Sequence, residues 1–466
     1  MKEHIFPRRI VQIRCRAGEE NLLKKQILQV GLAETVTTVF DRGDYVILDF
    51  GVEMCGGLRI LTAGFDSAQV RIRFGESLTE CCAELGGRQN ATNDHALRDM
   101  TVTLPFLSDM TFGNTGFRFV RLDFTGRATV KCAVAVNQIY KGNQIYRYTG
   151  PDDRITRIFE TAKRTVDLCA SSGLIWDGVK RDRLVWIGDM HPEMLAMTAL
   201  YGRTPAIERS LDYVKAQTPL PGWMNGFPMY SMWWIIILAD YFEESGQKAY
   251  IKKQIPYLKE LVQQMRGCVK DNGELDYPSY FVDWPTHGTP DELHGVRAIN
   301  IIAARKAAKL LDTFGEDSGP AEEMLGRLLK IEINPQRSKQ VLGLKYFAVG
   351  LTEGDKAKLT DGGAEGMSTF MSYYILKAVA SFDRDAAIDM MKQYYGAMLD
   401  LGATTFWEDF DIRWAENACR IDRFPREGQR DIHGDFGAHC YIGFRHSLCH
   451  GWSAGVLRFI KEECPD

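Results

Sequence analysis

Three acidic side chains lie in one short segment, WDGVKRDRLVWIGD, between two stretches with helical periodicity. They are Asp177, Asp182 and Asp189, and the same segment contains Arg181 and Trp186. Carboxyl groups that converge in one pocket can cleave a glycosidic bond, because one acid protonates the leaving oxygen while a second carboxylate activates water or attacks the sugar. Asp189 is also a candidate N-cap of the helix that follows it.

Two further segments place an acid beside a tryptophan. The segment GATTFWEDF contains Trp407 followed by Glu408, and FVDWP contains Asp283 followed by Trp284. Carboxylates accept hydrogen bonds from sugar hydroxyls, and aromatic rings stack on the apolar face of a sugar ring. The pattern indicates a saccharide pocket, although large aromatic side chains more often fill a core.

A group of histidines and cysteines near the end of the chain suggests a different chemistry, that of a metal enzyme. The group comprises His433, His439, His446, His450, Cys440 and Cys449. His446 and His450 have the i, i+4 spacing that places two imidazoles on one face of a helix. However, the run HSLCH lacks the glutamate that serves as the base in an HExxH site. We therefore expect neither a metal nor a cofactor.

Composition limits the classes of partner. The chain has 57 basic and 61 acidic residues, and no block of like charges is long enough to form a nucleic-acid arm. The N-terminus lacks the apolar run of a secretion signal. The most apolar segment, residues 229–239, is about half of the roughly 20 residues that span a bilayer. The 11 cysteines form no CxxC pair, which fits reduced thiols in the cytoplasm.

The elements that must position these residues fall into two regions. From residue 9 to about residue 141, runs such as QVRIRF and FRFVRLDF alternate apolar and charged side chains, as half-buried antiparallel strands do. One helix is expected at residues 19–29. The expected strands cover residues 11–15, 45–50, 58–61, 69–74, 101–104 and 117–124. This pattern predicts an N-terminal antiparallel β-sandwich over residues 1–145.

After the turn-prone Gly142 and the cluster GPDD, the hydrophobic period becomes helical. The expected helices cover residues 153–170, 190–202, 204–217, 228–245, 247–270, 292–314, 319–331, 366–381, 384–399 and 447–462. Many helices with almost no strand signal favour paired helices closed into a toroid around a central pocket. An open helical solenoid stays an alternative, although the sequence shows no fixed-period repeat.

Five blocks occur in a specific order: WDGVKRDRLVWIGD, FPMYSMWWIIILADYFEESG, FVDWP, GATTFWEDF and HSLCHGWSAG. Together they resemble the catalytic domain of bacterial α-L-rhamnosidases, glycoside hydrolase family 78. In the first region VILDFGVEMCGGLRI, RIRFGESL, TNDHALRD and TGFRFVRL are similar to that family's β-domain. The resemblance implies an (α/α)6 six-hairpin toroid over residues 146–466, and an inverting removal of terminal rhamnose from a small carbohydrate substrate. We also expect the family's usual C-terminal β-sandwich to be missing.

The resemblance also implies roles for individual residues. The family's acidic run commonly reads Arg-Asp-Glu-Arg-Leu-Gly-Trp-x-Gly-Asp, with the glutamate as general acid, and here Asp182 takes that place. Glu408 matches the general base in the family's TTxWE loop. The residues expected to bind substrate are Asp177, Arg181, Trp186, Asp189, Trp223, Tyr230, Asp283, Trp284, Trp407, His450 and Trp452.

Two other functions stay open at this point. A six-hairpin glycosidase acting on another sugar, such as an arabinoside or a uronide, is one, because specificity depends on individual pocket contacts. A carbohydrate-binding relative with weak or lost turnover is the other, because Asp182 is shorter than the family's glutamate. The sequence also leaves homo-oligomerisation open.

Overall fold

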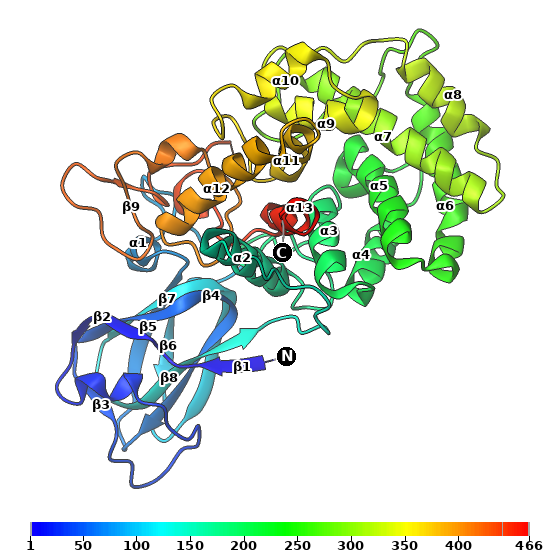
Figure 1. Ribbon diagram of the computed structural model, residues 1–466. Helices are drawn as coiled ribbons and strands as arrows, with labels where there is room; N and C mark the ends of the chain where they lie inside the picture. The colour runs from blue at the N-terminus through cyan, green and yellow to red at the C-terminus, as the bar shows by residue number, and fades with distance from the viewer. Residues whose placement is uncertain (1, 440, 465–466) are drawn as a thin grey trace.

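The computed structural model describes residues 2–439 and 441–464, and it has two different parts (Figure 1). The first third of the chain forms an antiparallel sheet, and the rest forms a body of packed helices. The last strand of the sheet ends at Gln138 and the helices begin at Asp153, on either side of the expected change in hydrophobic period. Within the described ranges, no helix combines the length and the apolar character that a membrane span requires.

Eight strands form one sheet in the order β1-β8-β4-β7-β5-β6, with β2 beside β4 and β3 beside β8. Their bounds are β1 (Lys2–Ile5), β2 (Arg9–Arg14), β3 (Thr38–Phe40), β4 (Tyr45–Ala63), β5 (Ala68–Gly75), β6 (Asp99–Leu104), β7 (Asp109–Phe124) and β8 (Ala128–Gln138). The first half of β4 pairs with β2, and its second half pairs with β8. Apolar side chains from both halves of β4, such as Leu48 and Ile60, belong to one core.

Each expected strand overlaps a strand of this sheet, but some strands are longer than the sequence predicts. The segments 45–50 and 58–61 are two parts of β4, and the segment 117–124 is the second half of β7. The prediction misses β8, because most of its side chains are buried on both faces and therefore do not alternate in polarity.

The helix expected at residues 19–29 is wrong. Only a 3-10 turn, Glu19–Leu23, forms there. Its N-cap residue, Gly18, has no side chain to cap the turn, and Leu22 is the one buried residue of the turn. A short helix without a cap or a packed apolar face is marginal in water, so the chain takes an irregular path.

Helices dominate the rest of the chain, as the periodicity predicts. Their bounds are α2 (Asp153–Cys169), α3 (Met190–Tyr201), α4 (Pro205–Ala216), α5 (Pro228–Ser245), α6 (Lys248–Gly267), α7 (Glu292–Thr313), α8 (Gly319–Leu328), α9 (Lys339–Val349), α10 (Glu353–Thr360), α11 (Ser372–Ala380), α12 (Arg384–Asp400) and α13 (Val456–Glu463). The prediction misses α9, which is buried over most of its length, and the two-turn α10. Neither shows the amphipathic period on which the prediction depends.

Six of these helices contact one another in a closed series. Helix α3 contacts α5, and the contacts continue through α7, α9, α11 and α13 back to α3. In Figure 1, α13 lies between α2 and α3 on one side and α11 and α12 on the other. Every residue of α3 is buried, which is typical of a helix with neighbours all round. The other helices of this region alternate with the six along the chain.

The last expected helix begins later than predicted. Residues 447–450 are not helical, and α13 follows a 3-10 turn, Gly451–Gly455. His446 and His450 therefore do not share one face of a helix. The spacing argument for a metal site at these two histidines does not apply.

Hydrogen bonds tie the sheet to the helices. Arg164 of α2 donates from Nε to the carbonyl oxygen of Glu53 at 2.9 Å, and the Glu53 backbone N–H donates to Oγ1 of Thr404 at 2.8 Å. Arg118 of β7 donates to the carbonyl oxygen of Gly402 at 3.2 Å. Because Gly402 and Thr404 begin the segment that carries Glu408, the sheet supports that segment directly.

Candidate active site

A pocket of about 190 Å³ lies among the segments that precede α3, α5 and α7 and those that follow α12. Most of the predicted residues line it, namely Asp177, Arg181, Asp182, Trp186, Asp189, Tyr230, Trp284, Glu408, His450 and Trp452. The tertiary structure thus brings together chemical groups from all five of the separated sequence blocks.

One guanidinium bridges two carboxylates in this pocket. Arg181, which is buried, donates from one terminal nitrogen to Oδ1 of Asp182 at 2.9 Å and from the other to Oε1 of Glu408 at 2.8 Å. Its Nε donates to the carbonyl oxygen of Arg445 at 2.8 Å, which fixes the plane of the guanidinium. The fork geometry of arginine suits such a bridge, because its donors point in fixed directions.

Glu408 is held on all sides. Its Oε2 accepts the Ser447 backbone N–H at 2.9 Å, and its own backbone N–H donates to the Ser447 carbonyl at 3.0 Å. Trp452 donates from Nε1 to the Glu408 carbonyl at 2.9 Å. Burial raises the pKa of Glu408, while the charge of Arg181 opposes the rise. The result is a rigid, desolvated carboxylate with a proton affinity above the ordinary one.

Asp182 lies nearer to solvent than Glu408. Its side chain is 19% exposed, and its backbone has a left-handed φ of 54°, followed by 56° at Arg183. Left-handed conformations are uncommon for residues other than glycine, and they concentrate at functional sites. Oδ1 of Asp182 lies 3.2 Å from Nδ1 of His95, which belongs to the loop between α1 (Leu78–Cys82) and β6.

His95 is thus a residue of the sheet region that touches the acidic segment of the helical region. The sequence contains it in the block TNDHALRD, but nothing in the sequence links that block to Asp182. Arg445 and Tyr441, which also line the pocket, have no distinguishing pattern in the sequence either.

The two remaining acids of the segment are buried. Asp177 accepts the Leu184 backbone N–H at 2.9 Å, and Asp189 accepts the Tyr230 hydroxyl at 2.9 Å. Burial and the neighbouring negative charges raise the pKa of both well above the ordinary value. Asp189 occupies the N-cap position of α3, but its side chain makes no capping hydrogen bond there. Its carboxyl group therefore lines the pocket and does not cap the helix.

His450 lies among these acids. Its Nε2 lies 3.8 Å from Asp177, 3.9 Å from Asp189 and 3.6 Å from Glu408. Burial and the charge of Arg181 lower the pKa of His450 well below its ordinary value. The imidazole is therefore neutral at neutral pH, and it can act as a hydrogen-bond donor or acceptor toward a sugar hydroxyl.

Aromatic rings form the walls of the pocket. Trp186 meets Tyr230 edge to face at a centroid distance of 6.0 Å, and Phe281 meets Trp284 at 5.1 Å. Trp452 lies against His450 at 4.1 Å. Flat apolar faces beside carboxyl groups are the combination that binds a sugar ring.

Three predicted residues do not line the pocket. Trp223 packs against Tyr277, and Trp407 is buried against Phe410. Asp283 is buried and accepts the Thr286 backbone N–H at 3.0 Å. In each acid–tryptophan pair only one member reaches the pocket, because adjacent side chains in an extended segment face opposite sides.

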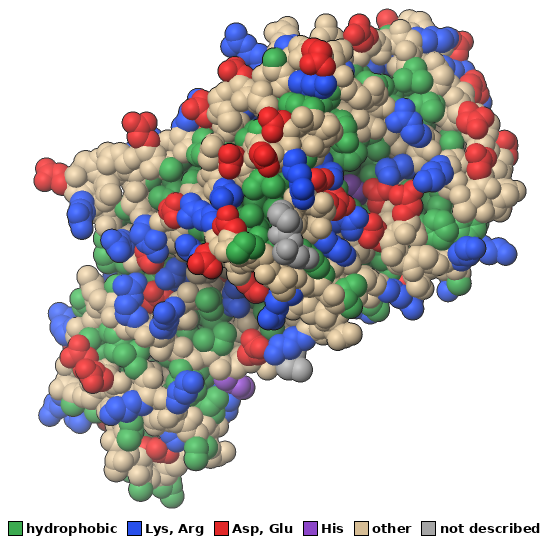
Figure 2. Space-filling model, in the orientation of Figure 1, with side chains coloured by type: hydrophobic (Ala, Val, Ile, Leu, Met, Phe, Trp, Pro, Cys, Tyr) green, Lys and Arg blue, Asp and Glu red, His purple; other side chains and the backbone are tan. Residues whose placement is uncertain are grey.

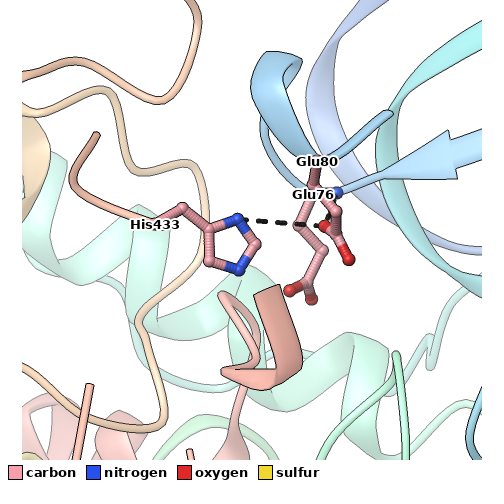
Figure 3. A group of neighbouring side chains, drawn as sticks. All are labelled: Glu76, Glu80 and His433. Carbon is pink, nitrogen blue, oxygen red and sulfur yellow. Dashed lines mark hydrogen bonds and ion pairs between the residues drawn. The ribbon is translucent and has the colours of Figure 1, made fainter. Parts of the chain in front are cut away.

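Glu76, Glu80 and His433 gather beside this site and have the composition of a metal centre (Figure 3). An ammonium group already lies there, since Nζ of Lys180 is 3.1 Å from Glu76 Oε2 and 3.2 Å from Glu80 Oε1. The same Nζ donates to the Phe444 carbonyl at 2.7 Å. Burial raises the pKa of Glu76 to about 7, against the opposing charge of Lys180. These contacts fit a lysine-centred cluster, which ties the acidic segment to the sheet.

The histidines and cysteines that the sequence offered as metal ligands do not gather at one centre. Among the described residues, His433 is the member of that group that joins a set with metal-ligand geometry. His439 stacks on Trp284, and His446 accepts the Asp409 backbone N–H at 2.9 Å. Cys449 is a buried free thiol, and Cys440 lies outside the described residues.

Replacement of Lys180 by methionine should destabilise the fold by about 3–5 kcal/mol, because it leaves the buried Glu76 and Glu80 without a counter-charge. Urea unfolding, followed by circular dichroism, measures this change. The exposed Lys252 provides the matched control, and Lys252→Met should unfold at the wild-type midpoint. Equal stability of the two variants would contradict the role of Lys180.

Comparison with known proteins finds relatives by structure alone. No family model and no curated protein matches the sequence. The rhamnosidase from Klebsiella oxytoca with rhamnose bound superposes with a TM-score of 0.76 at 19% identity, covering 99% of this chain and 96% of that one. The GH78 family rhamnosidase of Bacillus sp. GL1 gives 0.71 at 18% identity, covering 96% of this chain and 48% of that one.

The Streptomyces avermitilis α-L-rhamnosidase complexed with L-rhamnose gives a TM-score of 0.68 at 14% identity, covering 89% of this chain and 42% of that one. This chain therefore spans nearly the whole Klebsiella protein and about half of the other two. At such identities the likeness shows a shared fold.

Proposed function

We propose that this protein is a glycoside hydrolase that removes terminal α-L-rhamnose with inversion at the anomeric carbon. The observation that carries the proposal is the pocket in which Arg181 bridges Asp182 and Glu408 between aromatic walls. The fold shared with rhamnosidases, two of them solved with rhamnose bound, supports the choice of sugar.

Asp182 is the proton donor in this mechanism. It passes its proton to the glycosidic oxygen as the bond from the anomeric carbon to that oxygen breaks. Its partial exposure fits this role, because the leaving group must extend from the pocket toward solvent. Each turnover leaves Asp182 ionised, and Arg181 and His95 then stabilise the carboxylate.

Glu408 is the base. It takes a proton from a water molecule whose oxygen attacks the anomeric carbon from the opposite face of the sugar. Burial supports this role by raising the proton affinity of the carboxylate, and the Ser447 N–H holds its orientation. An inverting site needs room for that water, so the carboxyl groups of Asp182 and Glu408 should lie roughly 6.5 to 9.5 Å apart when substrate is bound.

The rest of the pocket binds the sugar. Asp177 and Asp189, whose pKa values burial raises, can hydrogen-bond sugar hydroxyls without leaving an uncompensated charge. Rhamnose is a 6-deoxy sugar and presents a methyl group. The apolar side chains of Phe227 and Phe281 suit that methyl group, because they line the same pocket.

The architecture that we propose has two domains, a β-sandwich over residues 1–145 and an (α/α)6 toroid over residues 146–466. The separate apolar cores of the sheet and of the helices support this division. The closed series of contacts through α3, α5, α7, α9, α11 and α13 supports the toroid.

A panel of aryl α- and β-glycosides tests the reaction and the sugar together. We expect hydrolysis of the aryl α-L-rhamnoside, with β-L-rhamnose as the first product seen by proton NMR. Hydrolysis of an arabinoside or a uronide, and not of the rhamnoside, would show that the proposed sugar specificity is wrong. Binding of rhamnose without turnover of any glycoside would favour a carbohydrate-binding protein.

Replacement of Arg181 by glutamine should move the acidic limb of the pH profile to higher pH. The base must be ionised, so activity falls as the pH drops through the pKa of Glu408, and the charge of Arg181 lowers that pKa. Loss of a neighbouring opposite charge shifts a carboxyl pKa by about 1–3 units. The measurement is kcat/KM against pH.

Arg183→Gln is the control for this variant. Arg183 bonds to Asn114 in the sheet region and does not bond to Glu408, so its loss should leave the limb in place. If the acidic limb of the pH profile stays in place in Arg181→Gln, that limb does not reflect the ionisation of Glu408.

A further inference from the structure

A second cavity, of about 600 Å³, opens where the sheet meets the helices, and it shares no lining residue with the pocket that holds Glu408. On the face drawn in Figure 2, Lys and Arg side chains gather over this junction. The charged residues that line the cavity are Arg8, Arg9, Arg118, Arg157, Arg420, Asp49 and Asp422. We call this cavity the arginine cleft. Its excess of positive charge contrasts with the net charge of −4 of the whole chain.

The two acids of the arginine cleft are already neutralised. Asp49 accepts hydrogen bonds from Arg9 at 2.9 Å and from Arg118 at 2.9 and 3.1 Å. Asp422 accepts two from Arg420, at 2.9 and 3.1 Å. Three arginines therefore neutralise the two acids. Neither carboxylate is free to form a two-oxygen ion pair with a further guanidinium.

Arg8 and Arg157 are the remaining cations. Within the described part of the chain, neither side chain has a carboxylate within ion-pair distance. Asp400, whose charge acts on Arg157, is held at 2.7 and 2.6 Å by both terminal nitrogens of Arg154. Both guanidiniums therefore keep their donors available to a ligand.

Two glycines make room for arginine side chains over the cleft. Gly51 has a φ of 85°, and a Cβ there would stand 2.8 Å from Cδ of Arg8. Gly402 has a φ of 96°, and a Cβ there would stand 3.2 Å from a terminal nitrogen of Arg420. Thr404, which also lines the cleft, uses its hydroxyl oxygen to accept the Glu53 N–H and keeps the hydroxyl proton as a donor.

We propose that the arginine cleft binds a small phosphate-bearing molecule. A phosphate group offers two negative charges and several acceptor oxygens, which several converging guanidiniums can share. A carboxylate has only two oxygens and pairs with one guanidinium. The cavity volume lies within the range of small-molecule sites and exceeds the need of an isolated phosphate ion. The occupant is therefore inorganic phosphate or, with better use of the space, a sugar phosphate.

Isothermal titration calorimetry of the full chain tests this proposal, with glucose 1-phosphate, inorganic phosphate, glucose and acetate as probes at constant ionic strength. We expect the two phosphates to bind and glucose and acetate not to bind. Tighter binding of glucose 1-phosphate identifies an organic phosphate as the occupant, and equal binding identifies the free ion. Absence of phosphate binding, or equal binding of acetate, would overturn the proposal.

The variants Arg8→Gln and Arg157→Gln locate the site. Both side chains are exposed and unpaired, so the variants should fold normally while Kd for phosphate rises about tenfold or more. Arg337→Gln is the matched control, because Arg337 is an exposed arginine outside the cleft. Unchanged affinity in both cleft variants would overturn the assignment. The readout is binding rather than turnover, so it is independent of the proposed glycosidase activity.

Discussion

Glu408→Gln should reduce turnover of every glycoside by roughly 10² to 10⁴-fold, the usual contribution of a general base. Attack by water needs a proton acceptor whatever the leaving group, so activated aryl glycosides and natural disaccharides should lose activity alike. Glutamine keeps the volume of the buried side chain and one acceptor for the Ser447 N–H. Initial rates on both substrate types measure the effect, and circular dichroism verifies the fold.

Glu416→Gln is the matched control for this variant. Glu416 is an exposed glutamate of the same segment, and its replacement should leave kcat unchanged. Azide, a nucleophile that needs no base, should restore turnover of an aryl α-rhamnoside by Glu408→Gln and yield the β-azide. An α-configured product, or a trapped covalent glycosyl-enzyme, would remove Glu408 from the role of base.

Unlike Glu408→Gln, Asp182→Asn should lose an amount of activity that depends on the leaving group. We expect a loss of roughly 10² to 10⁴-fold on a natural rhamnoside, whose departing oxygen needs a proton. Turnover of aryl substrates with acidic leaving groups should fall little, because such leaving groups depart without protonation. The ratio of kcat/KM values for the two substrates, compared between wild type and variant, is therefore the decisive measurement. Wild-type turnover of the natural rhamnoside by Asp182→Asn would refute the assignment.

Asp182→Glu separates a working enzyme from a binding protein. The longer side chain keeps the acid and extends its reach, so it should retain turnover if Asp182 is the donor. A wild-type protein that binds rhamnose without cleaving it, and that gains hydrolysis through Asp182→Glu, would be the weak relative that the shorter acid suggests. Asp385→Glu, the same change at an exposed position of α12, is the control, because Asp385 does not line the pocket.

Much of the architecture follows from the sequence, because hydrophobic period is a local property of the chain. The alternation in QVRIRF and FRFVRLDF and the long helical pattern after residue 153 identify the sheet and the helices with most of their bounds. Errors occur where burial removes the pattern, as in β8 and α9, and where a short helix has no amphipathic period, as in α10. At residues 19–29 the expected helix has no cap and no packed apolar face.

The acids of the pocket could also be predicted from the sequence. Asp177, Asp182 and Asp189 stand in one segment, and Glu408 follows a tryptophan in a recognisable loop, so their chemistry is visible without coordinates. Residue type and order along the chain are sufficient for such a prediction.

Only the tertiary structure decides which way each of these side chains faces and what it meets. The bridge from Arg181 to Glu408 joins residues 227 positions apart, and His95 reaches Asp182 from the sheet region. Trp407 enters the core while its neighbour Glu408 enters the pocket. The direction of a loop side chain depends on long-range packing and on the burial of charge, and neither of these is encoded in the local pattern of the sequence.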